Sequence, residues 1–104
     1  MNIETTEMDR TADAASDLLK ALANRHRLMI VCQLVDGERA VSDLAARLGI
    51  RQTTVSQHLA LLRKDGIVAT RRDGQTIYYR IGSDNARAIV ETLYRCFCAA
   101  EDAR

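Results

Sequence analysis

The stretch from Val41 to Ile81 constrains the fold most, because it fits two short helical patterns and two β-prone runs into one compact segment. The first apolar stripe has helical spacing and consists of Leu44, Ala45 and Leu48. The second consists of Val55, Leu59 and Leu62. Each pattern is followed by a glycine, which can adopt the left-handed conformation that ends a helix. Residues 42–65 are therefore predicted to form a helix-turn-helix.

The beginning of the second helix is polar outside its apolar stripe. Its hydrogen-bonding side chains are Gln52, Thr53, Thr54, Ser56, Gln57 and His58. Amide, hydroxyl and imidazole groups can pair with base edges in the major groove of DNA, which is wide enough to admit a helix. We expect these residues to contact DNA, together with Arg51 before the helix and Arg63 near its end.

Residues 67–81 are predicted to form a β-hairpin, here called the wing. Two β-prone runs flank Asp73-Gly74, a strong hairpin signal. The wing residues expected to contact DNA are Arg71, Arg72 and Gln75. The whole chain carries 15 basic and 14 acidic residues, whereas residues 50–82 carry six basic and two acidic ones, a net charge of +4. A solvated charged hairpin is the alternative interpretation of the wing alone, but the preceding helix pair favours DNA binding.

The flanking segments are predicted to be amphipathic helices. Asn24 and Ser83 can each cap the helix that follows. The helix after Asn24 has an apolar stripe of Leu28, Val31, Cys32 and Val35. The outer helices, 11–22 and 83–98, have more apolar surface than one small core requires, which predicts homodimerisation through them. Their apolar residues are Ala14, Ala15, Leu18, Leu19 and Leu22, and Ala86, Ile89, Val90, Leu93, Tyr94 and Phe97.

The composition fits one domain spanning residues 1–104, with 47% hydrophobic residues and no internal linker. Residues 1–10 are polar and acidic, unlike a secretory signal, and are expected to be flexible. No segment is apolar enough to span a bilayer, so no membrane partner is expected and a cytoplasmic location is predicted.

Three motifs resemble the ArsR family of winged-helix repressors. They are residues 22–28 (LANRHRL), residues 55–59 (VSQHL) and residues 71–79 (RRDGQTIYY). The resemblance implies a mainly α fold with a β-hairpin wing, in the order ααααββα. It also implies a homodimeric repressor that binds double-stranded operator DNA, expected to be an inverted repeat, and leaves it when an inducer arrives. Arg51 departs from the family pattern, because many relatives have a small hydroxyl residue there that can cap the helix.

The cysteines bear on the inducer. They are Cys32, Cys96 and Cys98. The thiolate and histidine metal sites familiar in the family are absent from residues 39–43 and 83–104, so no metal and no cofactor are predicted. Cys32 and Cys98 instead match the positions of the persulfide-sensing SqrR/BigR branch, in which reactive sulfur links two thiols. That resemblance makes them the inducer-sensing pair, with Cys96 as a possible accessory.

Other interpretations of the cysteines stay open. Cys32 can be an inert apolar residue, and Cys96 and Cys98 cannot both face it from an intact helix. If the last helical turn frays, all three thiolates can bind arsenite or another soft ion. A general thiol redox sensor is also possible. A thiol oxidoreductase is disfavoured because the chain lacks a Cys-x-x-Cys motif, and a protein-interaction winged helix is disfavoured by the basic wing, so no enzyme is expected.

Overall fold

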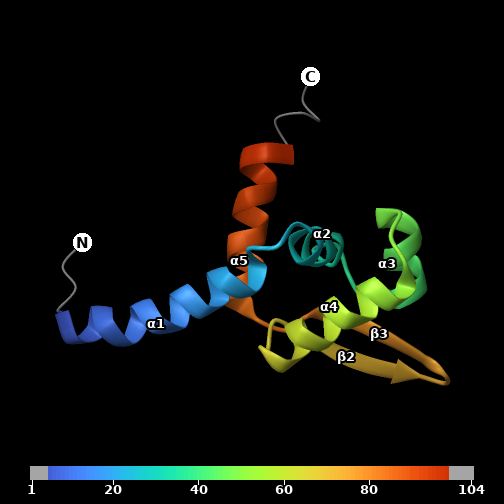
Figure 1. The fold of residues 1–104 in the computed structure, drawn as a ribbon, viewed down its shortest axis with the longest axis horizontal. Coiled ribbons are helices and arrows are strands. Elements are labelled where there is room, and N and C mark those ends of the chain that lie inside the picture. Colours follow the sequence, from blue (N-terminus) through green and yellow to red (C-terminus); the bar gives the residue numbers. More distant parts are fainter. Residues whose placement is uncertain (1–4, 99–104) are drawn as a thin grey trace.

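The computed structural model describes residues 5–98 and shows a helical body with a β-hairpin on one side (Figure 1). The elements are α1 (Thr5–Leu22), α2 (Arg25–Gln33), β1 (Arg39–Ala40), α3 (Val41–Leu48), α4 (Gln52–Lys64), β2 (Val68–Asp73), β3 (Thr76–Ile81), α5 (Asp84–Leu93) and a π-helical turn, η1 (Tyr94–Cys98). The predicted winged helix-turn-helix is confirmed. The structure adds β1 between α2 and α3, a strand of two residues that is too short to show a periodic pattern.

The three strands form an antiparallel sheet in the order β1-β3-β2. β2 and β3 are paired from Val68 opposite Ile81 to Asp73 opposite Thr76. Gly74 and Gln75 therefore form a two-residue turn, with Gly74 in the left-handed region at φ +65°. A glycine at the first position is typical of a type II′ turn. The predicted hairpin is confirmed. Its turn residues are Gly74 and Gln75, one residue later than Asp73 and Gly74, around which the sequence pattern was centred.

The core is built around α2, in which Ile30 and Val31 are 0% exposed, and Leu34, the residue just after the helix, is also 0% exposed. α2 packs against α1, α3, α4 and α5. The predicted stripe of α2 was therefore incomplete, because Ile30 and Leu34 are buried in addition to Val31, while Cys32 is only partly buried. A helix surrounded by other helices buries more than one narrow stripe.

Both predicted helix caps are present. The Asn24 side chain accepts a hydrogen bond from the Arg27 backbone N–H at 3.1 Å, and Ser83 accepts one from the Ala86 backbone N–H at 3.1 Å. α1 begins at Thr5 rather than Thr11, so residues 5–10, which we expected to be flexible, are helical. Residues 1–4 lie outside the described part of the chain.

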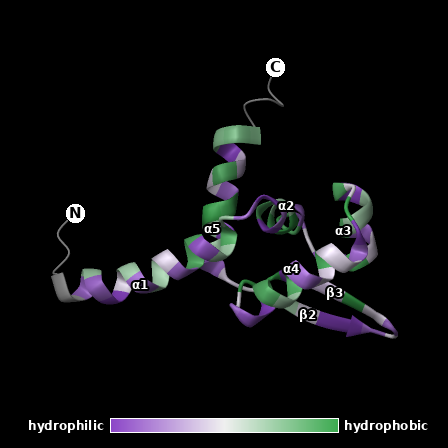
Figure 2. Cartoon of the chain, in the orientation of Figure 1, coloured by the Kyte–Doolittle hydropathy of each residue, from purple (hydrophilic) through white to green (hydrophobic). Residues whose placement is uncertain are grey.

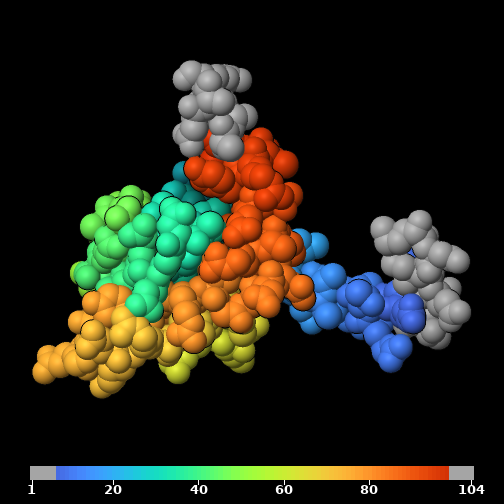
Figure 3. All heavy atoms as spheres, turned by 180° about the vertical axis from the view of Figure 1, so that it is seen from behind, coloured from blue at the N-terminus to red at the C-terminus, as the bar shows by residue number. Residues whose placement is uncertain are grey.

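α1 and η1, the turn that follows α5, leave large apolar side chains exposed on the single chain. α1 projects from the body, and α5 rises from it in another direction (Figures 1 and 3). Figure 2 shows hydrophobic residues along α5, whereas β2 is hydrophilic over much of its length. Leu22 is buried, but Leu19 is 54% exposed and Phe97 is 69% exposed. Within residues 5–98, no helix is long and apolar enough to cross a membrane.

The Asn24 cap yields a stability prediction. Replacing Asn24 with Ala should lower the free energy of unfolding by about 1 kcal/mol, because the Arg27 N–H at the start of α2 loses its acceptor. Urea unfolding at one fixed protein concentration measures the change. Asn85→Ala is the matched control, since Asn85 is exposed and is not the cap of α5. Equal losses in the two variants would contradict the capping role.

Candidate DNA-binding surface and cysteine pair

α4 presents one polar face to solvent because its opposite face is anchored in the core. Val55, Leu59 and Leu62 are each 0% exposed and hold the helix against the body. The structure brings most of the predicted DNA-contacting residues of α4 to the free surface. Gln52, Thr53, Ser56, Gln57 and Arg63 are exposed, and Thr54 is partly exposed. The surface therefore offers hydrogen-bonding groups from the first turns of α4 and a cation from its last turn.

His58 does not belong to this exposed face. Its ring meets the ring of His26 on α2 edge to face, with centroids 5.6 Å apart. Its Nδ1 atom is buried and has no hydrogen-bond partner among residues 5–98. Burial, and then the Arg27 charge and His26, lower the pKa of His58. His58 follows Val55 by three residues and precedes Leu62 by four, so helical periodicity already placed it beside the buried stripe.

Arg51 occupies the position before α4 and is exposed. Its backbone carbonyl accepts the first hydrogen bond of α4, from Val55 N–H at 3.1 Å. The Arg51 side chain makes no capping bond. This agrees with the expectation that an arginine cannot accept the bond that a hydroxyl residue would accept.

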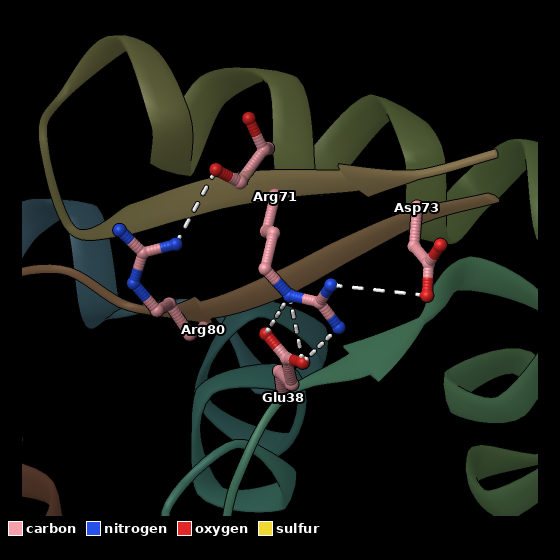
Figure 4. A network of polar contacts seen from close by, with 5 residues as sticks. Glu38, Arg71, Asp73 and Arg80 are labelled. Carbon is pink, nitrogen blue, oxygen red and sulfur yellow. Dashed lines mark hydrogen bonds and ion pairs between the residues drawn. The ribbon is translucent and has the colours of Figure 1, made fainter. Parts of the chain in front are cut away.

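Arg71 is held in place within the protein (Figure 4). Its Nε donates to both carboxylate oxygens of Glu38, at 3.0 and 3.1 Å, and its guanidinium lies 5.0 Å from the centroid of the Tyr78 ring. Asp73 lies 3.9 Å from the same guanidinium. The Arg71 hydrogen bonds hold the pKa of Glu38 below its ordinary value. To bind a DNA phosphate, Arg71 must therefore either release Glu38 or contact Glu38 and the phosphate at the same time.

The other wing residues are arranged differently. Arg72 is exposed and lies opposite Ile77 in the β2-β3 register, whereas Arg71 lies opposite Tyr78. Consecutive strand residues point to opposite faces, so Arg71 and Arg72 do not form one cluster. Gln75 is exposed in the turn. Glu38 was missed in the sequence because it is 33 residues from Arg71 and no local pattern links them.

The three cysteines are free thiols, and their environments differ. Cys32 is partly buried on α2, while Cys96 and Cys98 are exposed in η1. Burial raises the pKa of the Cys32 thiol, and the charge of Cys98 raises it further. Of the two cysteines of η1, Cys98 is the one whose charge raises the pKa of Cys32. Within residues 5–98, no group of three or more His, Cys, Asp or Glu side chains is arranged to hold a metal ion.

Residues 24–70 match the model of a family described as bacterial regulatory protein, arsR family. The transcriptional activator HlyU of Vibrio cholerae is 45% identical over 100 residues, which cover 96% of this chain and 91% of that protein. The chain belongs to the arsR family. It is thus similar to DNA-binding transcriptional regulators rather than to enzymes, and the resemblance inferred from the three motifs is confirmed.

Solved structures of arsR-family proteins show the same winged-helix fold. The transcriptional repressor BigR of Xylella fastidiosa has a TM-score of 0.85 at 44% identity, covering 94% of this chain and 97% of that one. The homodimeric winged helix-turn-helix DNA-binding domain Mb0332 of Mycobacterium bovis has a TM-score of 0.76 at 31% identity, covering 100% and 96%. This arsR-family chain is therefore a transcriptional regulator with a winged helix-turn-helix fold.

The Glu38–Arg71 pair yields a pH prediction. Because the pKa of Glu38 is lowered in the folded protein, its contribution to stability is present above the ordinary glutamate pKa of about 4.3 and is lost as pH falls through the lowered value. Arg71→Gln should return the Glu38 pKa toward its ordinary value. The carboxyl carbon shift of Glu38 in an NMR titration measures this. Arg72→Gln, on the neighbouring residue, should leave the titration unchanged, and equal shifts in both variants would contradict the pairing.

Proposed function

We propose that this arsR-family regulator is a repressor that binds operator DNA as a homodimer and is released when reactive sulfur links Cys32 to Cys98. The observation that carries the sensing proposal is the electrostatic effect of one of these thiols on the other. Cys32 lies half-buried on α2, and Cys98 is the cysteine whose charge acts on it. The similarity to the repressor BigR and the resemblance to the persulfide-sensing branch support the same assignment.

The dimer is supported by the exposed apolar residues Leu19 of α1 and Phe97 of η1, which continues from α5. A homodimeric domain with the same fold supports it further. A two-fold dimer presents two α4 helices to the major groove about 34 Å apart. This spacing and symmetry favour an inverted-repeat operator in double-stranded DNA.

The chemistry begins at the exposed thiol. Cys98 is accessible, whereas burial and the raised pKa leave less thiolate at Cys32 near neutral pH. The Cys98 thiolate attacks the sulfane sulfur of a persulfide donor, becomes a cysteine persulfide and releases the donor thiolate. A second donor converts Cys32 in the same way. One cysteine persulfide then attacks the other, forming a trisulfide bridge and expelling hydrogen sulfide, so that sulfane sulfur is the oxidant throughout.

Arsenite or another soft ion is the second candidate inducer, because three thiols lie in one chain and soft ions prefer such ligands. That site needs Cys96 and Cys98 to turn toward Cys32 together. In η1 both are exposed, and only Cys98 acts on Cys32. The arrangement therefore favours a two-thiol sensor over a three-thiolate site. A general redox sensor would respond to peroxide as readily as to persulfide.

Intact mass spectrometry tests the inducer. Reduced protein is exposed anaerobically to glutathione persulfide, and the remaining alkylatable thiols are counted in the same spectra. We expect added sulfur within one chain and protection of two thiols. Unchanged mass with three alkylatable thiols would contradict sulfur sensing, and parallel samples with arsenite or peroxide show whether either inducer is preferred.

Cysteine variants provide the functional prediction. Cys32→Ser and Cys98→Ser should each bind DNA as the parent does but should not be released by persulfide, because neither can form the bridge. Electrophoretic mobility shifts, using a duplex selected by the reduced protein from a random pool, measure both properties. Cys96→Ser is the matched control, since Cys96 is also an exposed thiol of η1 and should keep the response. Normal release of Cys32→Ser or Cys98→Ser would remove that residue from the sensor.

Two further variants separate base reading from phosphate binding. Gln57→Ala should reduce the preference for the selected duplex, because an amide that pairs with a base edge carries sequence information. Arg72→Gln should weaken binding to selected and random duplexes by the same factor, because a phosphate contact carries no sequence information. It should also make binding less salt dependent, because one phosphate contact is lost. Titrations at several salt concentrations measure both effects. A loss of sequence preference in Arg72→Gln would assign Arg72 to base reading instead.

A further inference from the structure

The contact between His26 and His58 lies directly behind the DNA-reading face of α4. The two rings meet edge to face with centroids 5.6 Å apart, one from α2 and one from α4. His58 follows Ser56 and Gln57 along the chain, and the side chains of both of these residues are exposed. The His58 ring therefore forms part of the contact that holds this part of α4, which carries the candidate base-reading residues, against α2.

The surroundings of His58 suit a neutral imidazole. Its Nδ1 is buried without a hydrogen-bond partner in the described part of the chain. Protonation places an N–H donor at that atom, where no acceptor compensates for the loss of water. A buried donor without a partner destabilises the folded protein, and a charged donor destabilises it more.

Nearby positive charge acts in the same direction. Arg27 and His26, both on α2, are the groups of the described chain that lower the pKa of His58 after burial itself. α3 and β2 also pack on α4, but no charged group from them in residues 5–98 shifts the His58 pKa. Protonated His58 is thus repelled by the helix against which it packs.

We propose that His58 is a positioning residue that holds α4 on α2 only while its imidazole is neutral, so that sequence-specific DNA binding weakens as pH falls. Protonation loosens the contact with His26 and lets α4 leave the orientation in which its exposed face meets base edges. This proposal rests on the DNA binding proposed above and adds a residue and a pH response to it. It involves neither the cysteines nor the wing.

The sign of the pH response distinguishes this role from direct DNA contact. A histidine on the DNA-facing surface would gain a positive charge at low pH and bind phosphate more tightly. A histidine that must stay neutral has the opposite effect, and each such imidazole changes the dissociation constant by up to about tenfold per pH unit. Protonation therefore tightens binding in one case and weakens it in the other.

The experiment uses the reduced full chain, a rhodamine-labelled duplex that it selected from a random pool, and a random duplex of equal length. Fluorescence anisotropy is measured from about pH 8 to about pH 5.5, which spans the ordinary imidazole pKa of about 6.5. We expect the selected duplex to lose affinity toward low pH, the random duplex to lose less, and His58→Gln to abolish the pH-dependent difference. His26→Gln should move the midpoint to higher pH, because one of the groups that lower the His58 pKa is gone.

Several results would overturn the proposal. One is that the selected duplex binds equally well or more tightly at low pH. Another is that His58→Gln keeps the pH response of the parent protein. If His58→Gln does not fold, NMR of the parent protein provides the test. The backbone amide shifts of α4 should then change with the same pH midpoint as the His58 ring. Amide shifts that do not follow the His58 titration would overturn the proposed role. No preference for the selected duplex at pH 8 would overturn DNA reading itself, whereas preference without pH dependence overturns only the role of His58.

Discussion

The burial of α2 is the interaction on which the other elements depend. Ile30, Val31 and Leu34 are fully buried, and complete burial of such a side chain stabilises the fold by about 1.5–3 kcal/mol. α2 contacts the helix that carries the reading face, α4, and the helix that leads to Cys98, α5. A covalent bond formed between the α2 and α5 segments would therefore act on the same core that orients α4. No additional element is needed to transmit the effect to α4.

The end of α2 is fastened to its neighbours by two arginines. Arg87 of α5 donates to the Val35 carbonyl at 3.0 Å, and Arg39 of β1 donates to the Gln33 carbonyl at 2.8 Å. Arg39 also pairs with Asp43 of α3 at 3.1 Å. Carbonyls at a helix C-terminus lack partners within the helix, so Arg39 satisfies the last carbonyl of α2 and interacts favourably with the helix dipole, while Arg87 binds the loop just beyond it. The segment next to Cys32 is thereby connected to α5, β1 and α3 at once.

Local chemistry predicted much of this fold, whereas long-range contacts were not accessible from the sequence. The Asn24 and Ser83 caps and the hairpin follow from side chains acting within a few residues. β1 exists only because it pairs with β3, and the Glu38–Arg71 pair joins segments that are distant in sequence. The DNA contact of His58 stays a prediction, although its ring meets His26 of α2 beside the buried stripe. For the cysteines, periodicity left Cys96 and Cys98 equivalent, and the fold distinguished them through the charge acting on Cys32.

A sulfur bridge can regulate such a structure because a close-packed core does not deform continuously. Side chains packed at native density change between discrete arrangements, so a covalent link between α2 and α5 biases the core toward one of them. A coupling of about 1–3 kcal/mol changes affinity by about 5 to 150-fold. Cys98 lies in η1 beyond α5, on exposed backbone, whereas Cys32 is fixed in the packed helix. In the proposed mechanism, the bridge draws the η1 end of α5 toward α2. Through the surface proposed for the dimer, it would then change the spacing of the two α4 helices.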